Sequence, residues 1–448
     1  MEAPPETRYA RHGDAYIAYQ VVGDGPVDLL LLPHFFHHLE LWWEDRHRAG
    51  FTRALAEFAR VILFDKRGTG LSDRTCGVPP FDVQMDDVRA VLDAAGSERT
   101  VLWAGGDASP MILLFAATFP QRTLGLVLWD PHPTYVRTPD MPWLMTRAEF
   151  EHAVDETARA LEERSGERLR EGLPSIGSDD ELRAFWRVSR LATSPGDHVA
   201  FTRVLAQTDV RHVLPTIRVP TLVLSNEALP DHHATTRYVA EKIPTAQLAI
   251  VPGRDRSMFV GDPRPILDEV GAFMEEIRNM PPEEPDRMLA TVLFTDIVGS
   301  TARTAELGDA GWRELLREHH SRVRRELARF RGRELDTAGD GFFATFDGPA
   351  RAIRCACAVR NSVRELGLEI RAGLHAGECE LLDGKVTGIA VALGARVAAH
   401  AQPGEVLVSS TVKDLVAGSG LRFSDRGEAE LKGIPGAWQL FVVEAGEL

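Results

Sequence analysis

The stretch FTDIVGST, residues 294–301, is followed about forty residues later by TAGDGFFATF, residues 337–346. The first stretch predicts a strand that ends on Asp296, then a Gly-Ser-Thr turn that opens a helix. Backbone N–H groups at such a turn point outward and attract phosphate. In the second stretch, Gly339-Asp340-Gly341 predicts a tight hairpin with one carboxylate at its tip. Two carboxylates beside a phosphate loop suit Mg²⁺ or Mn²⁺ better than zinc.

The chain has 448 residues, which is too long for one core of ordinary size, and we expect two domains. Residues 1–280 alternate apolar strands with helices, which predicts a parallel sheet covered on both faces. Strand signals stop at about 135–210, where charged helical sequence predicts a cap over this domain. The acidic, proline-rich stretch PPEEPD, residues 281–286, predicts a semi-rigid linker to a second domain at 287–448.

Hydrophobic periodicity predicts the individual elements. In the first domain we expect strands at 27–32, 61–64, 100–103, 124–129, 221–224 and 247–251, and helices at 51–59, 82–95, 110–118 and 235–243. In the second domain we expect strands at 288–295, 334–337, 342–346, 368–375 and 405–408, and helices at 310–330, 349–366 and 389–400.

Composition and charge are ordinary for a globular protein, with 44% apolar and 26% charged residues. The net charge of −15 provides no basic footprint for nucleic acid or an anionic membrane, although a bound metal ion lets an acidic protein hold a nucleotide. Cys76, Cys355, Cys357 and Cys379 have neither metal-site spacing nor a disulfide framework, which indicates a reducing compartment. The sequence has no signal pattern and no apolar run of about 20 residues, so we expect a cytoplasmic protein without a membrane span.

Six segments together carry a family resemblance, whereas Asp-Gly pairs alone are also ordinary turn chemistry. They are FTDIVGST, AGDGF, RAGLHAGE (371–378), GIAVALGARVAA (388–399), GEVLVS (404–409) and LKGIPG (431–436). In order and spacing they resemble the class III nucleotidyl cyclases over essentially the whole second domain. The resemblance implies a ferredoxin-like domain that converts a nucleoside triphosphate to its 3′,5′-cyclic monophosphate and pyrophosphate. It also implies a homodimer with the active site between two subunits.

The resemblance further implies roles for individual residues. Asp296, Ile297 and Asp340 would hold two Mg²⁺ or Mn²⁺ ions from one subunit, one acting on the ribose 3′-hydroxyl and one on the triphosphate. Gly299, Ser300 and Thr301 form the loop expected to bind phosphate. Arg396 would come from the other subunit and stabilise charge that develops on the α-phosphate, the alternative being a surface arginine.

The positions that read the base depart from the pattern of family members that use ATP. Those enzymes carry a lysine where this chain has Asp336, and an aspartate or threonine where it has Lys385. A carboxylate and then an ammonium suit guanine, so we hypothesise a GTP preference; alternatively the two residues pair across the interface and read nothing. The family's transition-state asparagine is Ala392 here, and loss of one positioned polar group costs about 10²–10³ in rate. The triphosphate-anchoring lysine has no clear counterpart near Trp438, where the nearest basic residue is Lys432.

The first domain resembles the α/β-hydrolase fold over roughly residues 8–278, through FDKRGTGLSD (64–73), the strand order and the cap. Such enzymes place the nucleophile on a sharp turn after a central strand. That turn reads GGDAS here, so the nucleophile position holds Asp107, as in haloalkane dehalogenases and epoxide hydrolases.

The acid and the histidine of a hydrolytic triad have no counterparts in this chain. The acid position falls near Leu229, with Asp231 the nearest carboxylate. The histidine position is Arg256, which stays protonated and cannot act as a general base. We therefore expect an ion pair between Asp107 and Arg256 in an inactive, regulatory domain; relocation of the base to His232 or His233 is the alternative.

The fold class expected is α/β: an amino-terminal α/β-hydrolase fold with a helical cap, and a carboxy-terminal ferredoxin-like α+β cyclase domain. The function expected is a nucleotide cyclase, with the first domain as a sensor of a small molecule or an organiser of the dimer. Two alternatives remain: a pseudocyclase that binds nucleotide without turnover, and a hydrolase that uses an aspartate nucleophile.

Overall fold

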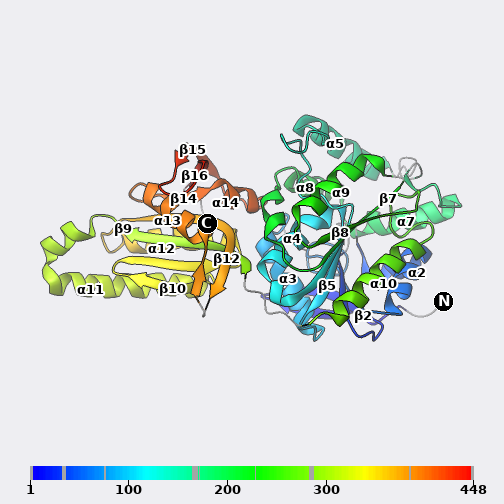
Figure 1. Cartoon of the computed structure of the whole chain (residues 1–448), viewed down its shortest axis with the longest axis horizontal. Coiled ribbons are helices and arrows are strands. Elements are labelled where there is room, and N and C mark those ends of the chain that lie inside the picture. Colours follow the sequence, from blue (N-terminus) through cyan, green and yellow to red (C-terminus); the bar gives the residue numbers. More distant parts are fainter. Residues whose placement is uncertain are drawn as a thin grey trace. The chain divides into compact units, whose positions relative to one another are not determined.

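The computed structural model describes residues 4–32, 37–74, 77–163, 170, 172–227, 229–281, 287–382 and 385–444. Internal contacts divide the chain into two compact units (Figure 1). The first comprises residues 1–79 and 83–284, and the second comprises residues 80–82 and 285–448. Cys76 and the linker residues 282–286 lie outside the described residues.

The first unit contains one sheet and helices that alternate with its strands. The strands are β1 Arg8–His12, β2 Ala15–Val22, β3 Asp28–Leu32, β4 Arg60–Phe64, β5 Thr100–Gly105, β6 Thr123–Trp129, β7 Thr221–Asn226 and β8 Ala246–Val251. The helices are α1 Leu39–Glu44, α2 Arg46–Ala56, α3 Phe81–Ala94, α4 Ser109–Thr118, α5 Arg147–Glu163, α7 Asp179–Ala192, α8 Pro195–Leu205, α9 Pro230–Lys242 and α10 Arg264–Asn279. Short 3₁₀ turns lie at η1 Gly106–Ala108, η2 Pro120–Arg122 and η3 Arg211–Thr216.

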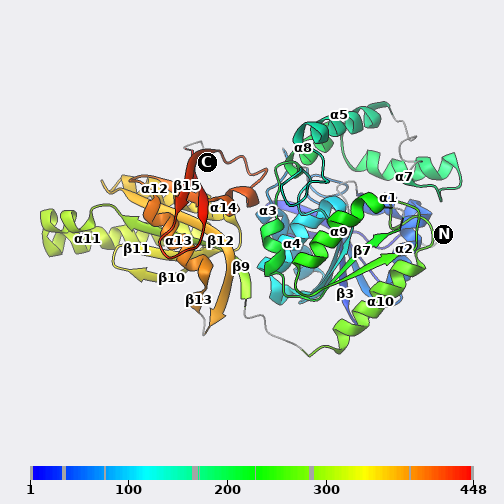
Figure 2. The same cartoon turned by 45° about the horizontal axis from the view of Figure 1, so that its top comes forward.

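The first sheet has the order β1-β2-β4-β3-β5-β6-β7-β8. The strands from β4 to β8 pair in parallel, whereas β1 and β2 form an antiparallel edge. The central strands are buried on both faces, and side chains of α2 and α10 pack against one of those faces. Helices α5, α7 and α8 come between β6 and β7 and lie together on one side of the sheet (Figure 2). They occupy the segment where the sequence predicts the cap.

The second unit contains a mixed sheet with three longer helices. Its strands are β9 Arg287–Ile297, β10 Arg333–Ala338, β11 Gly341–Phe346, β12 Ile370–Leu382, β13 Lys385–Thr387, β14 Val406–Ser409, β15 Phe423–Glu430 and β16 Ala437–Val443. Its helices are α11 Ser300–Arg329, α12 Pro349–Arg364, α13 Ile389–His400 and the short α14 Ser410–Leu415. The sheet order is β10-β11-β9-β12-β14-β16-β15, with β13 paired to β12.

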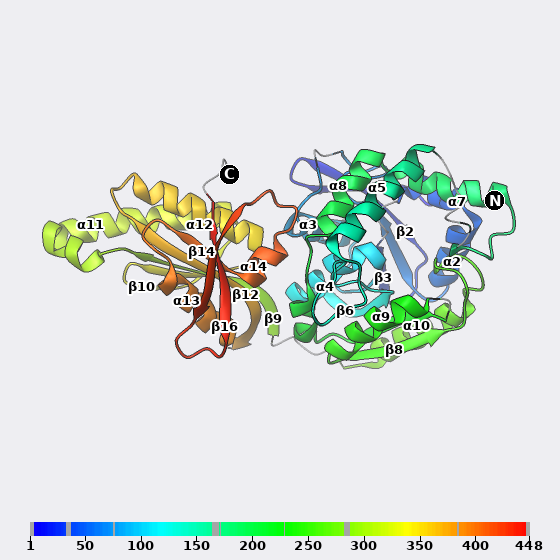
Figure 3. The same ribbon diagram turned by 90° about the horizontal axis from the view of Figure 1, so that it is seen from above.

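Helices cover both faces of the second sheet. Side chains that alternate along β9 separate the two faces, because successive residues of a strand point to opposite sides. Val292 and Phe294 face α13, where Gly394 lets the helix approach so closely that an added Cβ would lie 2.4 Å from Val292. Phe342 of β11 faces α11 instead and contacts its side chains. Figure 3 shows α12 and α13 on opposite faces of this sheet.

The main differences from the predicted elements concern strands. Strands β1, β2, β13, β15 and β16 were not predicted, and β12 runs seven residues beyond the predicted end at 375. Of these, β1 and β15 are polar edge strands, whereas β2 and β16 are largely apolar and lie inside their sheets. Helix α11 begins at Ser300, where the Gly-Ser-Thr turn predicts a helix start. It joins the predicted helix at 310–330 across a kink at Gly308, whose φ of 67° and ψ of 167° are not helical.

Candidate metal and phosphate site

The strand register brings the two candidate carboxylate residues to the same end of neighbouring strands. Strand β11 pairs antiparallel with β9, with Phe342 opposite Thr295. Asp296 follows Thr295 near the end of β9, and Asp340 comes two residues before Phe342, in the turn that precedes β11. The pairing of two distant sequence segments therefore assembles the site.

The predicted hairpin is present, and Asp340 lies in its turn. Ala338 at the end of β10 pairs with Gly341 at the start of β11, so Gly339 and Asp340 make a two-residue connection. Gly339 has a φ of 66°, in the left-handed region that such turns require. One carboxylate oxygen of Asp340, Oδ2, is buried and has no hydrogen-bond partner in the described structure. A buried acceptor of this kind is suited to a cation.

Asp296 carries an ion pair that the sequence analysis missed. Arg371 lies directly opposite Asp296 in the pairing of β12 with β9. Its Nη2 and Nε donate to Oδ2 of Asp296 at 2.6 and 3.1 Å. Both side chains remain partly exposed, at 39% and 38%. The arginine opens the segment RAGLHAGE, but its partner follows only from the register of the two strands.

The candidate phosphate loop has the expected backbone geometry. Gly299 has φ 69° and ψ 27°, and α11 begins at the next residue, Ser300. Within the described residues no side chain caps this helix start, so its first N–H groups are available to an anion. Gly299 and Thr301 are exposed.

The donor set fits Mg²⁺ or Mn²⁺ with substrate, but does not form a complete cage. In the described part of the chain no group of three or more His, Cys, Asp or Glu side chains is arranged for a metal ion. Mg²⁺ in enzymes of phosphate chemistry is commonly held by one or two carboxylates together with substrate phosphates and water. Asp296, Asp340 and the backbone carbonyl of Ile297 could supply such a partial set.

Arg396 lies on an exposed face of α13. Ile389, Ala392 and Arg396 follow one another at helical spacing, and all three are exposed, Ile389 at 63%. No ion pair or hydrogen bond from the Arg396 side chain to the described residues is found, so the guanidinium remains available. Ala392 stands four residues earlier on the same face and offers no polar group.

The two candidate base-reading residues are not brought together by a described contact. Asp336 is exposed on β10, and its Oδ1 accepts a hydrogen bond from the backbone N–H of Thr337 at 2.8 Å. Lys385 pairs through its backbone with Leu382, but its side chain lies outside the described part of the chain. Their role in reading the base therefore stays a prediction.

In the first unit, Asp107 follows β5 in the turn η1, after Gly106 with a φ of 48°. It interacts electrostatically with Lys66, His132 and Tyr135, none of which the sequence analysis selected. Burial lowers the pKa of the Lys66 ammonium, while Asp107 opposes that shift. Burial, and then the nearby His232, lower the pKa of His132 to about 4, so this imidazole is neutral at pH 7.

The expected ion pair between Asp107 and Arg256 is wrong. Arg256 is exposed, its side chain lies against Gly172, and its backbone N–H donates to the Gly172 carbonyl at 2.7 Å. The loop after β8 therefore contacts the cap segment, and the Arg256 side chain lies at the protein surface. The side chain of Asp231 lies outside the described residues.

The alternative bases on the loop after β7 have structural contacts. His233 Nε2 donates to the carbonyl of Asn226 at 2.8 Å. His232 packs edge-on against the ring of His132 at 5.5 Å, and its Nδ1 lies 3.9 Å from the carboxylate of Asp130.

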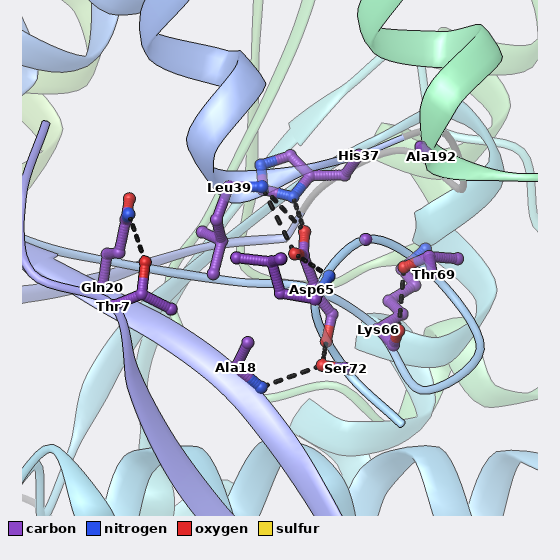
Figure 4. A network of polar contacts seen from close by, with 12 residues as sticks. Thr7, Ala18, Gln20, His37, Leu39, Asp65, Lys66, Thr69, Ser72 and Ala192 are labelled. Atoms are coloured by element: carbon purple, nitrogen blue, oxygen red, sulfur yellow. Dashed lines mark hydrogen bonds and ion pairs between the residues drawn. The ribbon is translucent and has the colours of Figure 1, made fainter. Parts of the chain in front are cut away.

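The segment FDKRGTGLSD organises loops through Asp65, which is fully buried (Figure 4). The Asp65 carboxylate accepts hydrogen bonds from the backbone N–H groups of Leu39 at 3.1 Å and Leu71 at 2.8 Å, and from His37 Nδ1 at 2.6 Å. The hydroxyl of Ser72 donates to the Asp65 carbonyl at 2.6 Å. Asp65 therefore stabilises the fold by satisfying buried donors.

A small cavity lies beside Lys66, between Met111 of α4 and Phe201 of α8. Its accessible volume is about 20 Å³, which is room for about one water molecule. In this structure the cavity does not admit a small organic ligand.

Comparisons with known proteins agree with this two-part architecture and with the predicted fold class. Residues 28–262 match the family model described as alpha/beta hydrolase fold, and residues 284–445 match that of the adenylate and guanylate cyclase catalytic domain. The chain therefore belongs to the α/β-hydrolase fold family, and it carries a class III nucleotide cyclase domain at its carboxy-terminal end.

The two parts resemble different proteins. The chain is 30% identical over 165 residues to "Putative adenylate cyclase 3" of Rhizobium meliloti (strain 1021), covering 35% of this chain and 28% of that protein. It is 30% identical over 211 residues to "Putative carbamate hydrolase RutD" of Caulobacter sp. (strain K31), covering 45% and 75% respectively. The bromoperoxidase of Bacillus anthracis shares the fold of 60% of this chain, at 18% identity, a TM-score of 0.50 and full coverage of that enzyme.

The chain spans a third or less of the length of the first curated relatives that it matches. Among the described helices, none has the length and apolar character needed to cross a membrane.

Proposed function

We propose that the second unit converts a nucleoside triphosphate to its 3′,5′-cyclic monophosphate and pyrophosphate, with two Mg²⁺ or Mn²⁺ ions, in a homodimer. The observation that carries this proposal is the partnerless buried oxygen of Asp340, next to the strand that ends with Asp296 and Ile297. The uncapped start of α11 supplies the neighbouring phosphate site. The match to the cyclase family supports the reaction class.

In this proposal, aspartates bind the metal ions and arginines stabilise the negative charge of the nucleotide. Bound metal ions would lower the pKa of the ribose 3′-hydroxyl and neutralise the triphosphate. Asp296 and Asp340 hold the ions. Arg371, which now pairs with Asp296, would be able to bind a phosphate oxygen when that carboxylate serves as a metal ligand, because a guanidinium binds both groups well. Arg396 of the second subunit stabilises the charge that develops on the α-phosphate.

The first test is turnover of ATP and GTP by the full chain in Mn²⁺, with cyclic nucleotide and pyrophosphate both measured. We expect a preference for GTP, because the Asp336 carboxylate accepts hydrogen bonds from the ring N–H and amine of guanine. Asp336→Lys should move the preference toward ATP, and Glu318→Lys, an exposed change on α11, is the matched control. A clear ATP preference of the unaltered chain contradicts the guanine reading but leaves the cyclase proposal intact.

A nucleotide-binding regulator without turnover is the second candidate. Ala392 favours it, since alanine cannot position the ribose or a water molecule by hydrogen bonding. Nucleotide binding with no cyclic product from either triphosphate would establish this reading. An aspartate-based hydrolase is the third, and it is disfavoured because the histidine position holds the exposed Arg256, which cannot act as a general base.

The first unit is proposed to organise or regulate the cyclase dimer. We expect that removing residues 1–280 changes the rate of cyclic nucleotide formation, because a second folded unit on each chain biases how two chains associate. Asp107→Ala in the full chain is the control and should leave that rate unchanged. The unaltered chain should hydrolyse no short acyl esters; hydrolysis that Asp107→Ala abolishes would contradict an inactive first unit. Equal rates for the truncated and full chains would make the first unit a passive attachment.

A further inference from the structure

The helix that begins beside Asp296 also contacts the turn that carries Asp340. Nε2 of His320, on the second half of α11, donates a hydrogen bond to the backbone carbonyl of Gly339 at 3.1 Å. Gly339 immediately precedes Asp340 and has a left-handed backbone. One side chain of α11 therefore holds the peptide group to which Asp340 is attached.

The imidazole of His320 is itself held by aromatic packing. Phe342, the second residue of β11, meets the His320 ring edge-on, with centroids 5.1 Å apart and planes at 89°. The neighbouring His319, which is fully buried, also packs against Phe342, with ring centroids 5.9 Å apart. Phe342 is 3% exposed. These contacts restrict the position of the His320 ring beside the turn.

One helical turn further along α11, Arg324 binds β10 near the start of the same hairpin. Its Nε and Nη2 both donate to Glu334 of β10 at 2.8 Å, and Glu334 also accepts the hydroxyl of Thr337 at 2.7 Å. The guanidinium of Arg324 stands 5.6 Å from the centroid of the Phe342 ring. His320 and Arg324 lie four residues apart and so share one face of α11. Together they attach that face to the hairpin at its tip and at its base.

We propose that His320 is a positioning residue, which fixes the hairpin turn so that the Asp340 carboxylate is oriented for a metal ion. The inference rests on the proposed function, since it assumes that Asp340 binds a cation. A two-residue turn with a glycine has few internal contacts to hold its tip. A metal ligand must be held to within about 0.5 Å by contacts outside the ligand itself. The bond to Gly339 supplies such a contact.

The test compares Mn²⁺ binding by the full chain and two variants, measured from the electron paramagnetic resonance signal of free Mn²⁺. His320→Phe keeps a ring against Phe342 but removes the donor, and His320→Gln keeps a donor of similar reach. Occupancy of the site is defined as the binding that Asp340→Ala abolishes. We expect His320→Phe to weaken this binding roughly 5- to 10-fold, the value of one hydrogen bond, and His320→Gln to restore most of it. Arg317→Ala, an exposed change on the same helix, should have no effect.

The unfolding temperature of each variant separates positioning from stability. Wild-type Mn²⁺ affinity in a folded His320→Phe chain would overturn the proposal, and so would equal weakening by His320→Phe and His320→Gln. Cyclic nucleotide formation is measured in parallel with Mn²⁺ binding. A chain that binds Mn²⁺ through Asp340 but forms no product contradicts the cyclase function alone, and leaves the role of His320 to be decided by the affinities.

Discussion

Replacing Asp296 with asparagine is expected to lower cyclic nucleotide formation by roughly 10³-fold, which corresponds to about 4 kcal/mol of transition-state stabilisation. Asparagine keeps the shape of the side chain and still accepts a hydrogen bond from Arg371, but it removes the charge that a cation requires. The side chain is 38% exposed, so the change should leave folding intact. The rate is measured in Mn²⁺ at saturating nucleotide.

Asp309→Asn is the matched control for this variant. Asp309 is an exposed aspartate on α11, the helix that begins beside Asp296. It should retain the wild-type rate. A fully active Asp296→Asn chain would remove the metal role from Asp296, and with it the main support for the proposed mechanism.

The second large effect concerns Arg396. Arg396→Ala is expected to lower the rate by about 10²–10³-fold, because the site would lose the guanidinium that we propose faces the α-phosphate. If the arginine acts across a twofold dimer, chains with Asp296→Asn and chains with Arg396→Ala should complement each other. In an equal mixture, half of all dimers contain one chain of each variant, and one of the two active sites in such a dimer is intact. About a quarter of the wild-type rate should therefore return on mixing or coexpression.

A second mixture controls for dimer formation alone. Asp296→Asn and Asp340→Asn chains carry their defects in the same half of the site, so no mixed dimer has an intact site. This mixture should stay inactive. Recovery there, or no recovery with the Arg396→Ala chain, would contradict a site shared between subunits.

Unbroken apolar runs predicted the buried parallel strands well, although the largely buried β2 was not predicted. The central strands of the first sheet are apolar throughout, and their predicted positions at 61–64 and 100–103 match β4 and β5 to within two residues. The edge strands escaped prediction because their exposed side chains carry no such signal; β15, for example, exposes Ser424, Asp425 and Arg426 in succession. Periodicity reports burial, and edge strands are poorly buried.

The candidate site was predictable where it depends on local sequence. The hairpin of Gly339 and Asp340 is such a case, since a turn of this kind needs a glycine with positive φ. The partner of Asp296 was not predictable, because Arg371 meets it through the register of two strands far apart in sequence. The predicted ion pair of Arg256 was wrong for a related reason: Arg256 contacts Gly172 of the cap segment, which is far from it in sequence. Side-chain partners that depend on contacts between distant parts of the sequence cannot be predicted from local patterns.

Under the proposed function, the ion pair between Arg371 and Asp296 would link metal affinity to nucleotide affinity. A cation that approaches Asp296 competes with a guanidinium already hydrogen-bonded to the same oxygen. A triphosphate offers that guanidinium another anionic partner, and so lessens the competition. Each ligand would then strengthen the binding of the other by the same factor, as thermodynamic reciprocity demands. This arginine would make occupancy of the proposed site cooperative, so that a lone cation or a lone nucleotide is expected to bind less well than the two together.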